Sequence, residues 1–535
     1  MGTVNYMIVC DHCGSIIRLR IGIGYSLRQP FAFSCKKCGT RIKGHLIAPS
    51  WDKLKLELNN ASEANKSELT EANYVVECHE DFLLTNEPVE GFKFTPFMNA
   101  LRLMEPNAEL FIRDRSLFYH NQNELKEKLF RINNFYSHDR ISELKKESNN
   151  LFNTDSKIEC FKSLAQLNEL YLIPIIAREV YRSNCVLYKN KIMNLLRNNK
   201  YELLKLIDHL NKDNFFDNQF EDNLKLLEDF DDLFMVIKPI ITLKYIDKKN
   251  MDNLMFSIVD FDKTRQFYLD VFECIGKELN MLIGLKNIEL NGDYEVLNHH
   301  RFSNIKSFND CIKSSNGNKK QFLDDSVDYY KLVEDVFDNK IRNGIGHHKC
   351  NLNEEKMEIE YYPHPDDIKK AKKETITYTS FILKVYNIFN LLLFFMYLKV
   401  ILYSIYFASK GERTVGVKEI NFIIEDNIPK VWVTYYWNEG NYSRPKILNY
   451  DFTYWDLNKI FDEFDLGGER AAKIHCDEYR VYFSMKGLKT VFKVRKSEMG
   501  EWLSSLLDRD RFEVKEKMFK PNLPFFILEP VLDLL

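Results

Sequence analysis

Four cysteines near the start of the chain have the spacing that points most directly to a chemical role. Cys10 and Cys13 form one C-x2-C pair, Cys35 and Cys38 form a second, and a glycine follows each pair. A C-x2-C turn presents two thiolates from one backbone knuckle, and Zn²⁺ binds four such ligands as a tetrahedron. Because protein would fill all four positions, the pattern predicts a structural Zn²⁺ site with no open position for catalysis.

The first 50 residues, which surround these cysteines, are strongly basic. Against one acid, Asp11, they contain Arg18, Arg20, Arg28, Lys36, Lys37, Arg41 and Lys43. This surplus of positive charge suits contact with a phosphate backbone, and Phe31 and Phe33 would offer faces on which bases stack. The alternative is a small basic module that docks on the acidic remainder of the chain, and the sequence leaves both open.

A second constellation, Arg342-Asn343-x3-His347-His348, has the residue types that cleave RNA without a metal. A neutral histidine can take the proton of a ribose 2′-hydroxyl, whose oxygen then attacks the adjacent phosphate. A guanidinium can bind the non-bridging oxygens and offset the charge that develops. Asn343 would orient the histidine or hold a phosphate oxygen. His347 and His348 both fit as the base, and a 2′,3′-cyclic phosphate would be the product.

Arg342-Asn343-x3-His347 resembles the R-x4–6-H motif of the HEPN superfamily, which is often Arg-polar-x3-His. The resemblance extends over residues 220–408, a minority of the chain. It implies a bundle of four to five helices and a homodimer that gathers two arginines and two histidines at one interface. It further implies metal-independent endoribonuclease activity and, as in many members, a bacterial toxin, abortive-infection or anti-phage role.

The elements that position this motif are expected to be helical. Apolar residues at helical spacing predict one helix over residues 325–341, which runs directly into the motif. Gly344 and Gly346 are poor helix formers, so we expect a turn or a new helix there. Arg342 would then lie at a helix end with His347 just past it. Another long helix is expected from about residue 365, where a proline suits the first turn.

The patterns along the chain predict a mainly α, multidomain protein in five regions. We expect a zinc ribbon over residues 1–50 and a mixed α+β region over 51–119. A helical region over 120–219 and a HEPN-like helical bundle over 220–408 follow. β-Branched and aromatic runs at 420–424, 431–437, 479–485 and 490–494, with helices at 455–464 and 497–507, predict a C-terminal α+β domain over residues 411–535.

Composition narrows the classes of function. The net charge of −3 over 535 residues gives no sign of a nucleic-acid or membrane partner for the chain as a whole. Eleven cysteines, four of them clustered, suit a reducing compartment, and without a signal peptide the expected location is cytoplasmic. Residues 382–408 are long enough to span a bilayer, but Lys384 and Lys399 interrupt them, which favours a core or dimer-interface helix.

The sequence thus predicts a cytoplasmic HEPN-like endoribonuclease that acts on RNA, with no membrane partner and no cofactor for catalysis. Its site would form across a homodimer built partly on residues 382–408. The zinc ribbon and the C-terminal domain would sense a phage-derived or nucleic-acid trigger. The alternative is a non-catalytic zinc-ribbon protein that binds nucleic acid or a partner and uses the bundle as a dimerisation scaffold. Arg342 would then pair with a local carboxylate such as Asp335 or Asp338.

Overall fold

The computed structural model describes most of the chain through residue 410 and five strands beyond it. The described residues are 2–24, 26–48, 53–64, 71–85, 94–124, 126–147, 157–172, 174–246, 256, 258–298, 305–346, 350–354, 356–364, 372–410, 415–425, 428–439, 442–445, 478–485 and 488–495.

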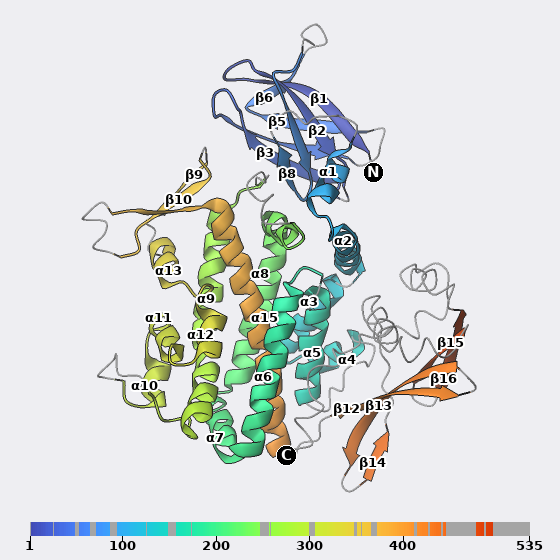
Figure 1. Cartoon of the computed structure of the whole chain (residues 1–535), viewed down its shortest axis with the longest axis vertical. Coiled ribbons are helices and arrows are strands. Elements are labelled where there is room, and N and C mark those ends of the chain that lie inside the picture. Colours follow the sequence, from blue (N-terminus) through green and yellow to red (C-terminus); the bar gives the residue numbers. More distant parts are fainter. Residues whose placement is uncertain are drawn as a thin grey trace.

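An N-terminal module of two small sheets opens the chain (Figure 1). One sheet has the order β6-β1-β2-β7-β8, in which β2 and β7 are parallel, and the other has the order β3-β4-β5. The strands are β1 (Thr3–Cys10), β2 (Ile16–Gly22), β3 (Arg28–Ser34), β4 (Arg41–Ile47), β5 (Lys55–Asn59), β6 (Ala61–Glu63), β7 (Tyr74–His79) and β8 (Phe82–Thr85). One apolar core joins residues from Ile8 to Leu83. The module therefore extends to β8, and the expected boundary at residue 50 is wrong.

Phe31 and Phe33 lie in the core of this module and not on its surface. Their exposed fractions are 2% and 0%, and their rings stack on each other with centroids 6.5 Å apart. The sequence interpretation that made them stacking faces for nucleic-acid bases is therefore wrong. Alternation along β3 places both rings on the buried face of the strand, as expected for a half-buried sheet.

Helix α1 (Pro96–Leu103) packs on β2, β7 and β8 of the module, and the other helices make up the body of the molecule below it (Figure 1). They are α2 (Ala108–Glu124), α3 (Lys126–Ser137), α4 (Ile141–Glu147), α5 (Lys157–Leu172), α6 (Arg178–Asn198), α7 (Lys200–Leu210), α8 (Phe215–Leu243), α9 (Phe261–Asn291), α10 (Phe308–Lys313), α11 (Asn316–Lys319), the 3₁₀ turn η3 (Lys320–Leu323), α12 (Val327–Val333), α13 (Asn339–Gly346) and α15 (Tyr378–Ser409). A single apolar core runs from Phe118 to Phe407. The expected boundary between residues 219 and 220 lies inside α8, so the two predicted helical regions form one unit.

Helix α15 is the central helix of this body, with α5, α6, α7, α8 and α9 packed around it (Figure 1). It is the one helix among the described residues long and apolar enough to cross a membrane, yet 94% of its most apolar window is buried. Its Lys399 is fully buried and forms an ion pair with Glu278 of α9. The core-helix alternative is confirmed. The stretch from Leu391 to Ile405 is buried against its own chain, and the dimer expected to form partly on residues 382–408 stays a prediction.

The segment that carries the Arg342 motif differs from the predicted single helix. Residues 334–338 separate α12 from α13, and Asp338 Oδ1 accepts hydrogen bonds from the backbone N–H groups of Lys340 and Ile341 at the start of α13. Helix α13 continues through Gly344 and ends at Gly346. Arg342 therefore lies in the middle of α13, and the expectation that it ends a helix is wrong.

A three-stranded sheet of order β11-β10-β9 lies between α13 and α15 in the chain. Its strands are β9 (Cys350–Asn353), β10 (Glu358–Tyr361) and β11 (Glu374–Thr377). Residues 365–371, where a long helix was expected to begin, lie outside the described residues, and the described long helix α15 begins at Tyr378, after β11. Thr377 caps it, because its hydroxyl accepts a hydrogen bond from the Ser380 backbone N–H.

The described part of the C-terminal region is a sheet of order β12-β13-β15-β16, with β14 paired to β13. Its strands are β12 (Val415–Glu425), β13 (Ile428–Glu439), β14 (Tyr442–Pro445), β15 (Glu478–Met485) and β16 (Leu488–Arg495). The four strands predicted from β-branched and aromatic runs are confirmed. The helices predicted at 455–464 and 497–507 lie outside the described residues.

Candidate functional site

The four cysteines of the two C-x2-C pairs converge at one point of the N-terminal module. Each pair forms the turn of an antiparallel hairpin, β1–β2 for Cys10 and Cys13 and β3–β4 for Cys35 and Cys38. Gly14 and Gly39, with φ of +69° and +77°, adopt the left-handed backbone that closes each turn. All four sulfur atoms lie within 4.8 Å of one another. The predicted convergence of these residues is confirmed.

The geometry of these sulfurs fits a tetrahedral metal ion. The Cys10–Cys38 and Cys13–Cys35 sulfurs are 3.7 and 3.6 Å apart. A tetrahedron with metal–sulfur bonds of about 2.3 Å has edges of about 3.8 Å, whereas a disulfide brings its sulfurs to about 2.05 Å. Cys10 and Cys35 are buried and Cys13 and Cys38 are half-buried, so the four side chains close the centre on all sides. This closure is typical of a structural site.

Hydroxyl groups support the sulfurs of this centre in a repeated pattern. Ser15 Oγ lies 3.3 Å from Cys13 Sγ, and Thr40 Oγ1 lies 3.2 Å from Cys38 Sγ. The Ser15 hydroxyl lowers the pKa of the Cys13 thiol to about 6, so this sulfur readily becomes the thiolate that a metal binds. The sequence interpretation missed this support, although the repeat C-x2-C-G-[ST] contains the signal.

The basic residues of the first 50 positions are largely paired within the chain. Arg20 binds Glu77 in the core, Arg28 lies 3.0 Å from Glu57, and Lys43 lies 2.7 Å from Glu354 next to β9. The buried Arg41 donates to the Phe256 carbonyl, 2.9 Å away. Four of the seven basic residues therefore bind groups of the same chain. This agrees with the alternative of a basic module that docks on the rest of the chain.

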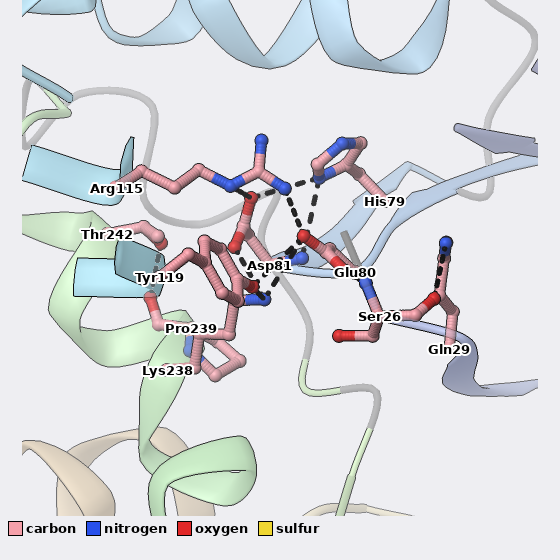
Figure 2. A network of polar contacts seen from close by, with 10 residues as sticks. All are labelled: Ser26, Gln29, His79, Glu80, Asp81, Arg115, Tyr119, Lys238, Pro239 and Thr242. Atoms are coloured by element: carbon pink, nitrogen blue, oxygen red, sulfur yellow. Dashed lines mark hydrogen bonds and ion pairs between the residues drawn. The ribbon is translucent and has the colours of Figure 1, made fainter. Parts of the chain in front are cut away.

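A buried network of charges fixes this module on the helical body (Figure 2). Glu80 and Asp81 lie in the turn between β7 and β8, Arg115 and Tyr119 come from α2, and Lys238 comes from α8. The Lys238 ammonium lies 3.0 Å from Asp81 Oδ1 and donates to the Tyr119 hydroxyl at 2.5 Å. Arg115 forms ion pairs with both Glu80 and Asp81. The charges of Glu80 and Asp81 are thus offset by those of Arg115 and Lys238 where the β7–β8 turn, α2 and α8 meet.

Electrostatics and close packing both keep this network in one arrangement. Burial alone would raise the pKa of Glu80, but Lys238 and Arg115 outweigh it and hold the pKa at about 2. The backbone of Gly24 passes so near that a Cβ atom there would lie 2.1 Å from the Glu80 carboxyl carbon. The carboxylates therefore stay ionised at neutral pH in a space that admits no larger side chain at position 24.

Of the predicted catalytic set, Arg342 and Asn343 lie in the described residues, and the Arg342 guanidinium contacts two other side chains. Its Nε and Nη2 donate to Glu273 Oε1 of α9 at 2.9 and 2.5 Å, and its Nη1 donates to Asn343 Oδ1 at 3.1 Å. The side chain is 34% exposed. The partner is therefore neither Asp335 nor Asp338, which the scaffold alternative named. Asp338 instead pairs with Lys384, at 3.1 Å.

His347 and His348, the two candidate bases, lie outside the described residues. They follow directly after α13, whose last described residue is Gly346. Asn343 is half-buried and contacts Arg342 through its side-chain oxygen. The structure therefore brings Arg342 and Asn343 together, and the position of the histidines stays a prediction.

Close packing explains the two glycines of the motif. A Cβ atom on Gly344 would lie 2.3 Å from the Tyr361 ring of β10, and one on Gly346 would lie 3.3 Å from Leu269 of α9. Gly344 thus lets α13 lie flush against the β9–β10 hairpin. The sequence interpretation treated both glycines as helix breakers. At position 344, however, glycine is required because a side chain would collide with Tyr361.

Three further residues near Arg342 were not identified from the sequence. Glu273 pairs with Arg342, and Asn316 of α11 donates to Glu273 Oε2 at 2.8 Å. Lys319 of α11 is 3% exposed, and burial lowers its pKa to about 8. Residues 298–320 are rich in polar side chains, so the sequence gives little sign of α10 and α11. No local pattern links Glu273 to a residue 69 positions further on.

Comparison with known proteins adds no identification, since no family model matches the chain and no curated protein or solved structure is significantly similar to it.

Proposed function

We propose that the protein is a metal-independent endoribonuclease of the HEPN type, with Zn²⁺ as a structural ion in the four-cysteine centre. Arg342 holds the scissile phosphate, Asn343 orients the site, and His347 or His348 is the general base. The substrate is RNA, because the reaction uses the ribose 2′-hydroxyl as its nucleophile. Two copies of the chain supply one composite site, and the N-terminal module and residues 411–535 serve as sensors of a phage-derived or nucleic-acid trigger in the cytoplasm.

The observation that carries this proposal is the state of the Arg342 guanidinium. It is one-third exposed, and three of its five N–H groups are used by Glu273 and Asn343. In the part of the chain that the structure describes, one N–H of each terminal nitrogen has no hydrogen-bond partner. N–H groups on the two terminal nitrogens of one guanidinium can bind two oxygens of a phosphate, which arginine offers and lysine does not.

The reaction needs no redox partner and no external nucleophile. The histidine removes the 2′-hydroxyl proton, the 2′-oxygen bonds to phosphorus, and the bond from phosphorus to the 5′-oxygen breaks. The 5′-oxygen leaves with a proton supplied by an imidazolium, and a 2′,3′-cyclic phosphate remains. Charge gathers on the non-bridging oxygens as the bonds exchange, and Arg342 stabilises that charge.

RNA cleavage with a substrate that carries a single 2′-deoxynucleotide at the mapped cut position tests the proposal. The wild-type chain is expected to cleave the all-ribose strand in EDTA, to leave cyclic phosphate ends, and to spare the deoxy-substituted bond. Metal content is measured in the same samples, so that loss of the structural ion is seen directly. Arg342→Ala, His347→Ala and His348→Ala are compared with Arg197→Ala, which changes an exposed arginine on α6. Cleavage of the deoxy-substituted bond, or full activity in all three site variants, would overturn the proposal.

A scaffold without catalysis is the second candidate function, and the ion pair between Arg342 and Glu273 favours it. An arginine that is paired within its own chain has a structural use that requires no substrate. In this case the wild-type chain cleaves no RNA, and Arg342→Ala changes only the stability of the contact between α13 and α9. Sedimentation at several protein concentrations measures the dimer that both candidates predict.

A further inference from the structure

Glu273 of α9 fixes the direction of the Arg342 guanidinium. Oε1 accepts from Nε at 2.9 Å and from Nη2 at 2.5 Å, so one oxygen holds one edge of the planar group. Asn343 holds Nη1 from its own side at 3.1 Å. With these contacts on both sides, rotation of the guanidinium would break at least one hydrogen bond. The two N–H groups that these contacts leave over are the ones that a phosphate would take.

Glu273 is itself held in place by α11. Asn316 Nδ2 donates to Glu273 Oε2 at 2.8 Å and to the Glu273 backbone carbonyl at 3.3 Å. This amide occupies the space beside Gly276, where a Cβ atom would come within 2.4 Å of it. The absence of a side chain at position 276 therefore allows α11 to approach α9 closely enough for the contact.

The contacts close into a ring that returns to Arg342. Asn339, the first residue of α13, donates through Nδ2 to the Gly317 carbonyl of α11 at 2.6 Å. Helix α11 is thus tied to α9 by Asn316 and to α13 by Gly317, and α13 is tied back to α9 by Arg342. The ring connects three segments that are distant in the sequence, and the guanidinium is one of its links.

We infer that Glu273 is a positioning residue for the phosphate clamp and that Asn316 positions Glu273 in turn. The inference rests on the proposed function, since it assigns these residues a task in that reaction. A carboxylate beside the clamp repels a phosphate, so charge alone would make Glu273 unfavourable for RNA binding. Its benefit is orientation: an exposed, flexible arginine would lose conformational entropy on each binding event, and the ring fixes the guanidinium beforehand.

Two substitutions at position 273 separate orientation from charge in a steady-state cleavage assay. Glu273→Ala removes both contacts, and kcat should fall by about 10- to 100-fold, the range for residues that orient a functional group. Glu273→Gln keeps an oxygen that can accept from both nitrogens and removes the negative charge, but its amide nitrogen then faces the donor Asn316 Nδ2. It should therefore lower KM and reduce kcat by no more than Asn316→Ala does. Asn316→Ala should lower kcat by several-fold, about 3- to 10-fold.

A double-mutant cycle with Arg342 distinguishes positioning from a purely structural ion pair. If Glu273 acts through the guanidinium, Glu273→Ala has no further effect on kcat in the Arg342→Ala background. The matched control is Glu289→Ala, which removes a carboxylate of the same helix that lies 2.7 Å from Lys191, and it should leave kcat and KM unchanged. Thermal unfolding of each variant shows whether the fold is retained.

The outcomes separate this inference from the proposed function. A wild-type chain that does not cleave RNA overturns both. A wild-type chain that depends on Arg342, together with Glu273→Ala at full kcat, overturns the positioning role alone. Equal and additive losses from Glu273→Ala in the wild-type and Arg342→Ala backgrounds would also overturn it, because the carboxylate would then act independently of the clamp.

Discussion

The four-cysteine centre and the Arg342 site are both small polar constellations, but they are assembled in different ways. Each half of the cysteine centre is built within six residues of one hairpin turn, and only the meeting of the two turns requires the fold. The Arg342 site depends on α9, α11 and α13, which lie up to 70 residues apart. Local spacing can specify a site of the first kind, whereas the second kind exists only after helices have packed.

The largest expected effect tests the first half of this comparison. Cys35→Ser removes one of the four ligands of the proposed Zn²⁺ centre, whose ion would bind as the module folds. Structural Zn²⁺ sites contribute on the order of 10 kcal/mol, so loss of one ligand should cost several kcal/mol and unfold the two sheets. Metal content and limited proteolysis measure the change. Cys350→Ser, at a half-buried cysteine outside the centre, is the control. A Cys35→Ser chain with bound metal and a protected module would contradict a four-cysteine centre.

The next effect concerns the junction between the two regions. Lys238→Met removes a cation that faces both Glu80 and Asp81, so that Arg115 is left to pair with both carboxylates and His79 remains beside Asp81. Loss of one partner from a buried ionic network costs about 3–5 kcal/mol. Chemical denaturation should show this loss, with the N-terminal module released first. Lys205→Met, at a solvent-exposed lysine that pairs with Glu202, should change stability far less than Lys238→Met. Equal effects of the two substitutions would show that the network does not hold the module.

The third effect is a gain in stability and concerns Lys319, a buried lysine beside the Arg342 site. Burial lowers its pKa to about 8 from the ordinary lysine value of about 10.5, so the charged amine is disfavoured in the folded state. The free energy of unfolding should therefore rise from pH 8 to about pH 10.5, where the unfolded state binds more protons than the folded state. Lys319→Met removes this penalty, which is about 3 kcal/mol for 2.5 pKa units.

The Lys319→Met variant should thus be more stable than the wild type at pH 7, with a gap that closes as the pH approaches 10.5. Urea denaturation of both chains at pH 7, 8, 9 and 10 measures the gap. Lys313→Met, at an exposed lysine on the neighbouring α10, should show no such dependence. A gap that is constant with pH would mean that Lys319 is not buried in its charged form.

The smallest effect separates the two glycines of the motif. Gly344→Ala places a methyl group 2.3 Å from the Tyr361 ring, and overpacking of this kind costs about 1–3 kcal/mol. At Gly346 the nearest atom is the flexible end of Leu269, 3.3 Å away, so Gly346→Ala should be within about 1 kcal/mol of neutral. Thermal unfolding compares the two variants. If Gly346→Ala were the more destabilising substitution, the close packing of α13 on β10 would not explain the glycine at position 344.

The features that the sequence predicted correctly are local, whereas those that it missed depend on tertiary packing. The cysteine centre, the strands of the C-terminal sheet and the core position of α15 depend on short spacing or on composition, and these predictions are confirmed. The break between α12 and α13 was missed because Val333, Phe337 and Ile341 keep a helical period across it. Asp338 ends that period by capping α13, and Asp followed by Asn is a cap signal that the sequence does contain.

The partner of Arg342 had no comparable signal. Asp335 and Asp338 were chosen because they are near in sequence, but on α13 the guanidinium faces α9, and the carboxylate there is Glu273. The same limit applies to Phe31 and Phe33, whose burial depends on β4 and on a second sheet that includes β7 and β8, beyond the predicted module. Which face of a helix or strand is buried can be seen only in the folded structure.

The central position of α15 has a consequence for the order in which the chain is made. Helices α5 to α9 leave the ribosome before the helix on which all of them pack. Until residue 409 has been synthesised, their apolar faces have no permanent partner, and exposed apolar surface of this kind favours aggregation and chaperone binding. The helical body, including the helices that carry Glu273 and Arg342, should therefore close late in translation, and nascent chains that stop short of α15 should be open and inactive.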